Sequence, residues 1–246
     1  MKIIFKMITV IILVYLTSTF ALTGEEILKK MDFNRDYKTM KCNALMEIHI
    51  DDKIRTKSMS IKGMLEGKKS LVEFLNPEDK GTKYLMLDDN LWIYFPEEED
   101  VVKISGHMLK EGMMGSDVSY EDALENDLLS EKYDITITGE EKFSDKDCYV
   151  ITLEAKVKDA PYHKRIMYVD KVDFVGLKEE MYAKSGKLLK ESVVLEIAEI
   201  TGRKYPVKSE MVNKLRKNSK TVFTMSDLKF DVVFEKDIFT MRNLRK

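Results

Sequence analysis

Proline, cysteine, histidine and tryptophan are scarce in this sequence of 246 residues, which holds four prolines, two cysteines, three histidines and one tryptophan. With so few prolines and no low-complexity linker, we expect a single domain after the N-terminal segment. An excess of basic residues is also absent, because 41 lysines and arginines are interspersed with 43 acidic residues. This balance excludes the basic face of a nucleic-acid-binding protein, so we predict no nucleic-acid partner.

Motifs of common enzymes are missing as well. The chain has no G-x-S-x-G, no H-E-x-x-H and no glycine loop that would cradle a phosphate. Among the histidines, His49 and His163 lie in strand-like patterns, and only His107 lies in a loop, near Ser116 and Asp117. A lipid-cleaving enzyme would need these last three side chains within hydrogen-bond distance. A glycine turn followed by a helix start explains Ser116 and Asp117 more simply, so we predict that the protein is not an enzyme.

The few sulfur and imidazole groups give little support for a metal site. Cys42 and Cys148 are too far apart in sequence for a metal motif, and each falls in a strand-like alternation. Each is therefore either a small buried apolar residue or half of a disulfide, which export would permit. The loop holding His107 also contains methionines, soft ligands that suit Cu(I), but no Met-x-Met repeat accompanies them. We predict no metal and no cofactor.

Long apolar runs are absent after the N-terminus. Residues 1–21 begin with the basic Lys2 and Lys6, continue with an apolar run over residues 7–16, and end with small residues at Thr19 and Ala21. This order is typical of a signal peptide cleaved after Ala21. The run is shorter than the roughly 20 residues of a spanning helix, and an uncleaved anchor is the alternative. We expect the mature chain, residues 22–246, to be soluble and exported to the periplasm.

Alternating apolar and polar residues dominate the rest of the chain and predict half-buried antiparallel strands. We expect about ten or eleven strands between Thr39 and Phe234, in a simple meander with turns such as Asp51-Asp52 and Gly139-Glu140. Short helices are predicted near residues 23–31 and over residues 119–129, with Ser119 as N-cap and Asp122 at N3. The predicted buried rows are Cys42, Ala44, Met46, Ile48 and Ile50; Tyr133, Ile135 and Ile137; Tyr149, Ile151, Leu153, Ala155 and Val157; and Val175, Leu177 and Met181, with Glu179 interrupting the last row.

One segment, "SGHMLKEGMMGSDVSYED" at residues 105–122, is too polar for a core strand and too rich in glycine for a helix. Gly106, Gly112 and Gly115 would permit unusual backbone angles there. Methionine side chains are flexible and suit surfaces that accept varied apolar shapes, so the loop either covers an apolar cavity or plugs the end of the sheet. The candidates for lining or covering a cavity are Tyr84, Met86, Trp92, Tyr94, Met108, Met113, Met114 and Tyr120.

Four motifs in residues 74–124 now point to a known family. They are an x-P-x-x-K-G-T strand start at residues 76–82, a W-x-Y-x-P strand at residues 92–96, a K-I-S-G strand end at residues 103–106, and an M-G-S-D-x-S-Y-E-D loop at residues 114–122. The endings "RKYPVKSEM" (203–211) and "DIFTMRNLRK" (237–246) fit the same pattern. The chain resembles the exported LolA-like family of outer-membrane lipoprotein-sorting proteins.

The resemblance implies a single curved antiparallel sheet that forms a half-open β-barrel, with helices plugging its concave side. It further implies a hydrophobic cavity that carries a lipid or a lipoprotein acyl chain from an inner-membrane transporter to an outer-membrane acceptor. It implies no catalytic residue. The alternative is a non-catalytic periplasmic subunit that docks a membrane transporter.

Overall fold

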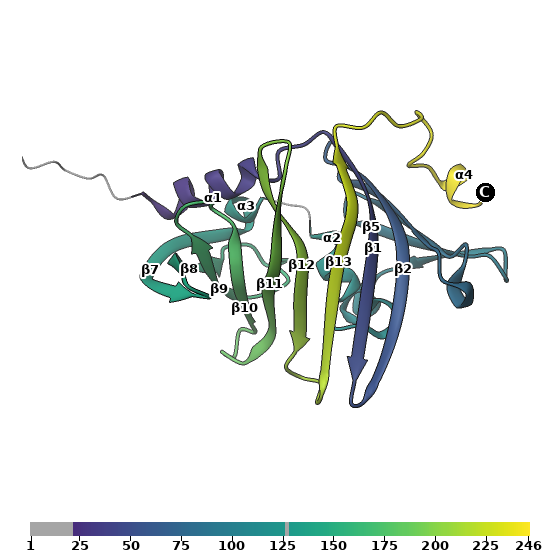
Figure 1. Cartoon of the computed structure of the whole chain (residues 1–246). Coiled ribbons are helices and arrows are strands. Elements are labelled where there is room, and N and C mark those ends of the chain that lie inside the picture. The colour runs from purple at the N-terminus through teal and green to yellow at the C-terminus, as the bar shows by residue number, and fades with distance from the viewer. Residues whose placement is uncertain (1–21, 126–127) are drawn as a thin grey trace, which may run out of the picture.

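One antiparallel sheet of thirteen strands dominates the computed structural model, which describes residues 22–125 and 128–246 (Figure 1). The predicted signal peptide, residues 1–21, lies outside this part of the chain. The strands are β1 (Thr39–Ile50), β2 (Lys53–Met64), β3 (Lys69–Phe74), β4 (Lys83–Leu87), β5 (Asn90–Phe95), β6 (Asp100–Ile104), β7 (Tyr133–Phe143), β8 (Lys146–Ala155), β9 (Lys164–Asp170), β10 (Gly176–Tyr182), β11 (Leu188–Ile200), β12 (Arg203–Asn213) and β13 (Ser219–Phe230). The helices are α1 (Gly24–Phe33), α2 (Tyr120–Leu124), α3 (Leu129–Lys132) and α4 (Met241–Leu244), and 3₁₀ turns occupy Pro77–Asp79, Gly106–Lys110 and Met113–Gly115.

The sheet consists of two meanders, the first formed by β1 to β6 and the second by β7 to β13. They are joined where β1 pairs with β13. The strand order is β6-β5-β4-β3-β2-β1-β13-β12-β11-β10-β9-β8-β7, so β1 pairs with β13 and the edges are β6 and β7. The predicted open, curved antiparallel sheet is confirmed. The predicted single meander is wrong, because β1 and β13 pair across almost the whole length of the chain, and that pairing leaves no local signal in the sequence.

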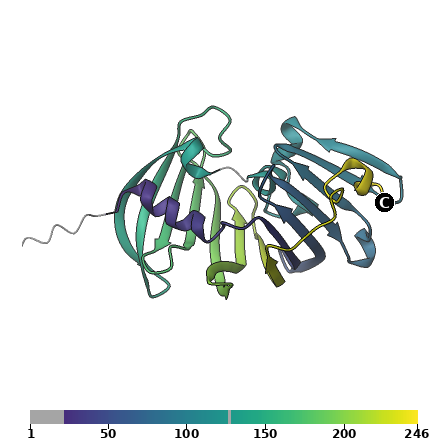
Figure 2. The ribbon, with the colours of Figure 1, turned by 90° about the horizontal axis from the view of Figure 1, so that it is seen from above.

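The chain passes from one edge of the sheet to the other between β6 and β7. This crossing segment, residues 105–125 and 128–132, contains α2 and α3 and runs along the inner, concave face (Figures 1 and 2). Its residues Met113 and Leu124 are buried against strands of the first meander. The predicted loop at residues 105–122 is therefore the start of the connection that carries the chain across the sheet.

Helix α1 covers the inner face of the second meander (Figure 2). Thr23 caps its N-terminus, and a capping box with Glu26 completes the start of the helix. Ile27 and Leu28 are its buried apolar residues, and they pack on a cluster built from β7, β8 and β9. The end of α1 is tied to the sheet by Asn34, whose Nδ2 donates to the Asp173 carbonyl at 3.0 Å and whose Oδ1 accepts from the Lys204 N–H at 3.1 Å.

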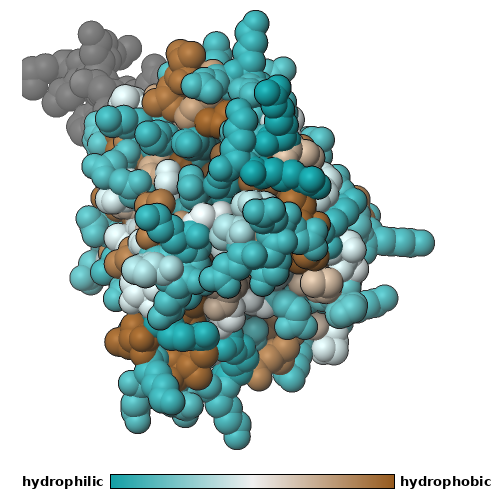
Figure 3. Space-filling model, turned by 90° about the vertical axis from the view of Figure 1, so that its right-hand side faces the viewer, coloured by the Kyte–Doolittle hydropathy of each residue, from teal (hydrophilic) through white to brown (hydrophobic). Residues whose placement is uncertain are grey.

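The outer face of the first meander is covered by the C-terminal segment, residues 231–246. Phe239 and Leu244 pack there against Leu71 and Leu85, in a cluster that includes Trp92. Figure 3 views this side of the molecule, which is mostly hydrophilic with apolar residues in separate spots. The last residues of the chain thus serve as a cover for the sheet.

Several local predictions hold. The β1 row is buried from Cys42 to Ile48, and Ser119 forms the predicted capping box with Asp122. Cys42 and Cys148 are free and buried, which excludes the disulfide, and burial raises the pKa of Cys42 to about 11.

Other local predictions are wrong. The sheet has two or three strands more than predicted, because short strands such as β4, β5 and β6 offer few alternations to count. The helix predicted over residues 119–129 ends at Leu124. Gly139 lies at a bulge inside β7 rather than in a turn. Val157 lies beyond the end of β8.

Candidate functional site

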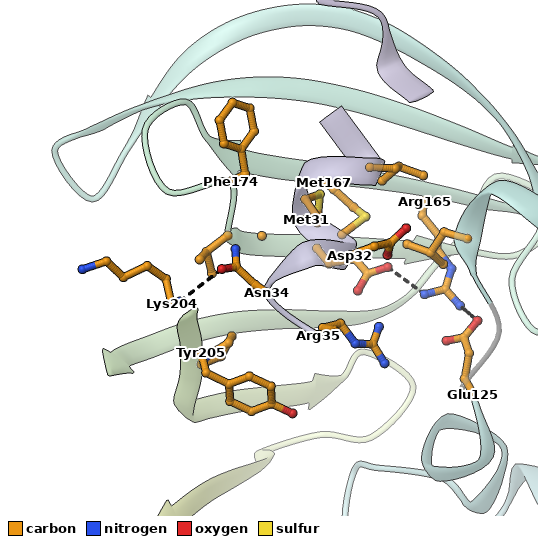
Figure 4. Close-up of a pocket in the computed structure, with 16 residues that line it drawn as sticks. Met31, Asp32, Asn34, Arg35, Glu125, Arg165, Met167, Phe174, Lys204 and Tyr205 are labelled. Carbon is orange, nitrogen blue, oxygen red and sulfur yellow. Dashed lines mark hydrogen bonds and ion pairs between the residues drawn. The ribbon is translucent and has the colours of Figure 1, made fainter. Parts of the chain in front are cut away.

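A cavity of about 250 Å³ lies between α1 and the inner face of the second meander (Figure 4). Apolar side chains from the helix and the sheet line its middle, and a cluster of charged side chains around Arg165 forms one end, while Asp32, Arg35 and Lys204 also line it. In Figure 4, Met31 of α1 and Met167 of β9 lie side by side in the middle, with Arg165 at one end and Phe174 at the other. The lining residues are Leu28, Met31, Asp32, Asn34, Arg35, Glu125, Leu129, Arg165, Met167, Phe174, Val175, Gly176, Glu179, Lys204, Tyr205 and Pro206.

Gly176 at the start of β10 leaves the space that the methionines occupy. A Cβ atom placed on Gly176 would lie 3.3 Å from the Cε atoms of both Met31 and Met167. The register between β9 and β10 shifts next to it, because Gly176 pairs with Val169 whereas Lys178 pairs with Tyr168. A larger residue at this position would therefore point at the methionines and fill the cavity.

The same bulge explains why the predicted β10 row is interrupted. Leu177 packs on Cys148 on the outer side of the sheet, whereas Glu179 lines the inner cavity. Two residues that alternation places on one face thus lie on opposite faces, because the bulge between Gly176 and Lys178 makes Leu177 an extra residue in β10. The interruption at Glu179 was the one sequence signal of this site.

The charged end of the cavity is a buried arginine with two carboxylates. Arg165 is only 3% exposed, and its Nη1 donates to Glu179 at 2.8 Å while its Nη2 donates to Glu125. Its Nε donates to the Tyr133 hydroxyl at 3.1 Å, and its guanidinium lies over the rings of Tyr133 and Tyr162 at 5.1 and 5.0 Å. Burial raises the pKa of Glu179 despite the nearby guanidinium. Two carboxylates and two tyrosine rings thus hold the guanidinium in one position.

A second, outer cavity of about 330 Å³ adjoins the first at the end of α1. Both are lined by Asp32 and Arg35. Phe33, Leu65 and Leu128 line the outer cavity and are 63, 42 and 48% exposed. Exposed apolar side chains thus lie together beside the inner cavity, and contiguous exposed apolar patches mark interaction sites more often than single exposed residues do.

The M-G-S-D-x-S-Y-E-D motif fastens the crossing segment to the central strands. Asp117, only 1% exposed, accepts hydrogen bonds from the hydroxyls of Ser219 at 2.6 Å and Thr221 at 2.9 Å on β13. Asp122 accepts from Ser119 within the capping box and from Lys190 of β11. Both carboxylates are largely buried and hydrogen-bonded, so the motif holds the crossing segment against the sheet.

Glycines shape the turn before this fastening. Gly115 has a φ of +77°, and Gly106 has a φ of +59°, as the prediction of unusual backbone angles required. Gly112 has an ordinary backbone, but a Cβ there would lie 2.0 Å from the Ser116 carbonyl oxygen. Gly112 is thus needed for close approach rather than for a left-handed conformation.

The residues predicted to line a cavity separate into three groups. Tyr84, Met86, Met113, Met114 and Tyr120 come together on the inner face of the first meander, in a packed apolar cluster. The Tyr84 hydroxyl donates to the Met114 sulfur at 3.0 Å there. Trp92 and Tyr94 lie on the outer face under the C-terminal segment, and Met108 is exposed. None of the eight lines the cavity beneath α1.

The proposed nucleophile, base and acid of a lipid-cleaving enzyme are not assembled. Ser116 is 1% exposed, and its hydroxyl donates to the Val118 carbonyl at 3.1 Å. Asp117 is engaged by β13, and His107 is exposed in the turn at Gly106–Lys110. His107 and Met108 are exposed, whereas Met113 is buried. The side chains considered as Cu(I) ligands therefore lie in different environments.

Within the described residues, no helix is long and apolar enough to cross a bilayer. That finding concerns residues 22–125 and 128–246 alone.

Comparisons with known proteins identify the family. A family model described as "-like: Uncharacterized protein" matches residues 66–246. The fold is similar to a DUF1329 family protein from Desulfovibrio piger (28% identity, TM-score 0.84, covering 90% of this chain and 97% of that one). It is also similar to a putative outer membrane lipoprotein-sorting protein domain from Vibrio parahaemolyticus (25%, 0.81, 91% and 98%).

A LolA superfamily protein from Nitrosomonas europaea has the same fold, with 23% identity and a TM-score of 0.74 over 91% of this chain and all of that one. No curated protein matches the sequence. These solved structures have the fold that the resemblance in residues 74–124 implies. The chain belongs to the LolA-like family.

Proposed function

We propose that this protein is an exported periplasmic carrier that binds a lipid or lipoprotein acyl chain beneath α1 and moves it between membranes. The observation that carries the proposal is the cavity with Met31 and Met167 in its walls, which opens beside the exposed Phe33, Leu65 and Leu128. The family supports it, because the similar Vibrio protein is described as a lipoprotein-sorting domain. An inner-membrane transporter as donor and an outer-membrane acceptor are the partners we propose.

The volume of the cavity can be compared with the volume that ligand pockets usually have. Ligand pockets usually measure about 300–1,000 Å³, and the inner cavity of about 250 Å³ falls just below that range. The adjoining outer cavity brings the total into the range. Each methylene group moved from water into such a site contributes about 0.8 kcal/mol, so even a partly buried chain offsets the cost of association.

The test is titration of the mature protein with a fluorescent fatty acid, using two matched glycine variants. Gly176→Leu places a side chain against flexible methionine ends and fills the cavity, so we expect at least a tenfold loss of affinity. Gly139→Leu adds the same side chain where nothing lies within 4 Å, and its affinity should equal that of the wild type.

Two outcomes contradict the proposal in different ways. A wild-type protein that takes up no fatty acid would favour the non-catalytic subunit that docks a transporter. Equal binding by Gly176→Leu and the wild type would place the acyl chain elsewhere in the molecule.

A further inference from the structure

The charged groups in direct contact with Arg165 do not balance. One guanidinium serves two carboxylates, those of Glu125 and Glu179. The neighbouring pair of Lys190 and Asp122 is balanced within itself. Because burying a charge costs several kcal/mol unless it is paired, the second carboxylate is held less favourably than a simple pair would be.

The two carboxylates differ in how firmly the fold holds them. Glu179 lies within β10, paired with Met167 on one side and Ser192 on the other. Glu125 lies after the end of the five-residue helix α2, outside the sheet. Its side chain lines the cavity and is 15% exposed. Glu125 is therefore the partner that can leave Arg165 while the sheet stays unchanged.

Arginine presents a planar fork of donors that matches a carboxylate or a phosphate. The rings of Tyr133 and Tyr162 and the contact with Glu179 hold this fork in position at the end of an apolar cavity. In Figure 4, Arg165 and Met167 are neighbours along one wall of that cavity.

We propose that the protein selects anionic amphiphiles, whose negatively charged group takes the place of Glu125 on Arg165 while the acyl chain lies against Met31 and Met167. This proposal rests on the proposed function, since it assigns a ligand class to the same cavity. Glu125 then acts as a placeholder that keeps the guanidinium paired when the cavity is empty. A fatty-acid carboxylate and a lipid phosphate share the chemistry required.

The experiment is calorimetric titration of the mature protein with dodecanoate, dodecyl phosphate and methyl dodecanoate. The three probes have the same chain and differ in the charged group. We expect the wild type to bind one or both anions more tightly than the ester, by about tenfold. The anion that binds more tightly identifies the source of the negative group, a carboxylate or a phosphate.

Glu125→Gln removes the competing charge, so it should tighten the binding of the preferred anion about tenfold and leave the ester unchanged. Glu121→Gln, on the preceding turn of α2, is the matched control and should match the wild type with all three probes. Arg165→Gln should abolish the preference for anions, but it leaves two carboxylates buried, so Glu125→Gln remains the decisive variant in case that protein does not fold.

The outcomes separate this inference from the function on which it rests. If the ester and the anions bind with equal affinity, the anion site is wrong and the carrier stands. If Glu125→Gln tightens all three probes equally, Glu125 merely holds the cavity shut, and the proposed exchange is wrong. If none of the probes binds, both proposals fail.

Discussion

The two meanders of the sheet present similar apolar inner faces, yet they are covered differently. In the first, the crossing segment places Met113, Met114 and Leu124 into a packed cluster with Tyr84. In the second, α1 covers the sheet and leaves a cavity beside Met31. The first face is covered by a connection fastened through buried carboxylates, and the second by a helix whose end is tied by Asn34. This difference fits our proposal that the second half holds the ligand while the first half supports the fold.

The largest effect should come from breaking the fastening of the crossing segment. Asp117→Ala leaves the buried hydroxyls of Ser219 and Thr221 without their acceptor, so we expect the free energy of unfolding to fall by about 3–4 kcal/mol. Urea denaturation measures this loss. Asp52→Ala, in an exposed turn, should change it by less than about 0.5 kcal/mol. Similar values for the two variants would mean that Asp117 does not hold the segment in place.

A smaller loss should follow from removing the cover of the outer face. Phe239→Ala leaves a gap in the cluster with Leu244 and Trp92, and because Phe239 is 9% exposed we expect a cost of about 3 kcal/mol, the low end for such truncations. Because Trp92 is the only tryptophan, its emission should shift to longer wavelength. Fatty-acid affinity should stay unchanged, since this cluster lies on the face opposite the cavity. A parallel loss of affinity would show that the two faces are coupled.

The fastening should also make stability depend on acid pH. Burial alone would raise the pKa of Asp122, but Lys190, Tyr162 and Ser119 together hold it below its usual value. A lowered pKa in the folded state stabilises the protein fully above the unfolded value of about 3.9, and this contribution disappears as the pH falls through the folded pKa. The difference in stability between the wild type and Asp122→Asn should therefore shrink below about pH 4. A difference that is constant from pH 7 to pH 3 would contradict this assignment.

The smallest effect concerns how the crossing segment meets the first meander. Tyr84→Phe removes the hydroxyl that donates to the Met114 sulfur and keeps the buried ring, so the loss of stability should be about 1 kcal/mol or less. Burial raises the pKa of Tyr84 above its ordinary value, so its hydroxyl stays protonated as a donor. A loss comparable to that of Asp117→Ala, measured in the same urea experiment, would mean that the contact between Tyr84 and Met114 holds the whole crossing segment in place.

Local patterns in the sequence predicted the strands and the helix caps. They did not predict which face of the sheet is covered by the crossing segment, by α1 or by the C-terminal segment. The rows in β1 and the capping box at Ser119 depend on neighbours two or three residues away, and both are found as predicted. Trp92 and Tyr84 both looked suited to a cavity, because β4 and β5 carry apolar residues on both faces. Register decides between them, since Trp92 pairs with Leu85, which faces outward, and not with Tyr84.

The cavity itself was hidden for a related reason. Met31 comes from the N-terminal helix and Met167 from a strand more than a hundred residues later, so no short motif joins them. The local signal is Glu179, a charge in an otherwise apolar row, which by itself indicates an interrupted row and not a site. Its partner Arg165 follows His163 and Lys164 in the sequence and has the appearance of a solvated strand residue there.

The most direct test of the account asks which half of the sheet holds the acyl chain. The wild-type protein would be loaded with a diazirine-labelled fatty acid, irradiated, digested and mapped by mass spectrometry. We predict adducts on Met31, Met167 and Phe174, around the cavity beneath α1. Adducts confined to Met113, Met114 and Tyr84 would place the ligand under the crossing segment and contradict the division between the two halves.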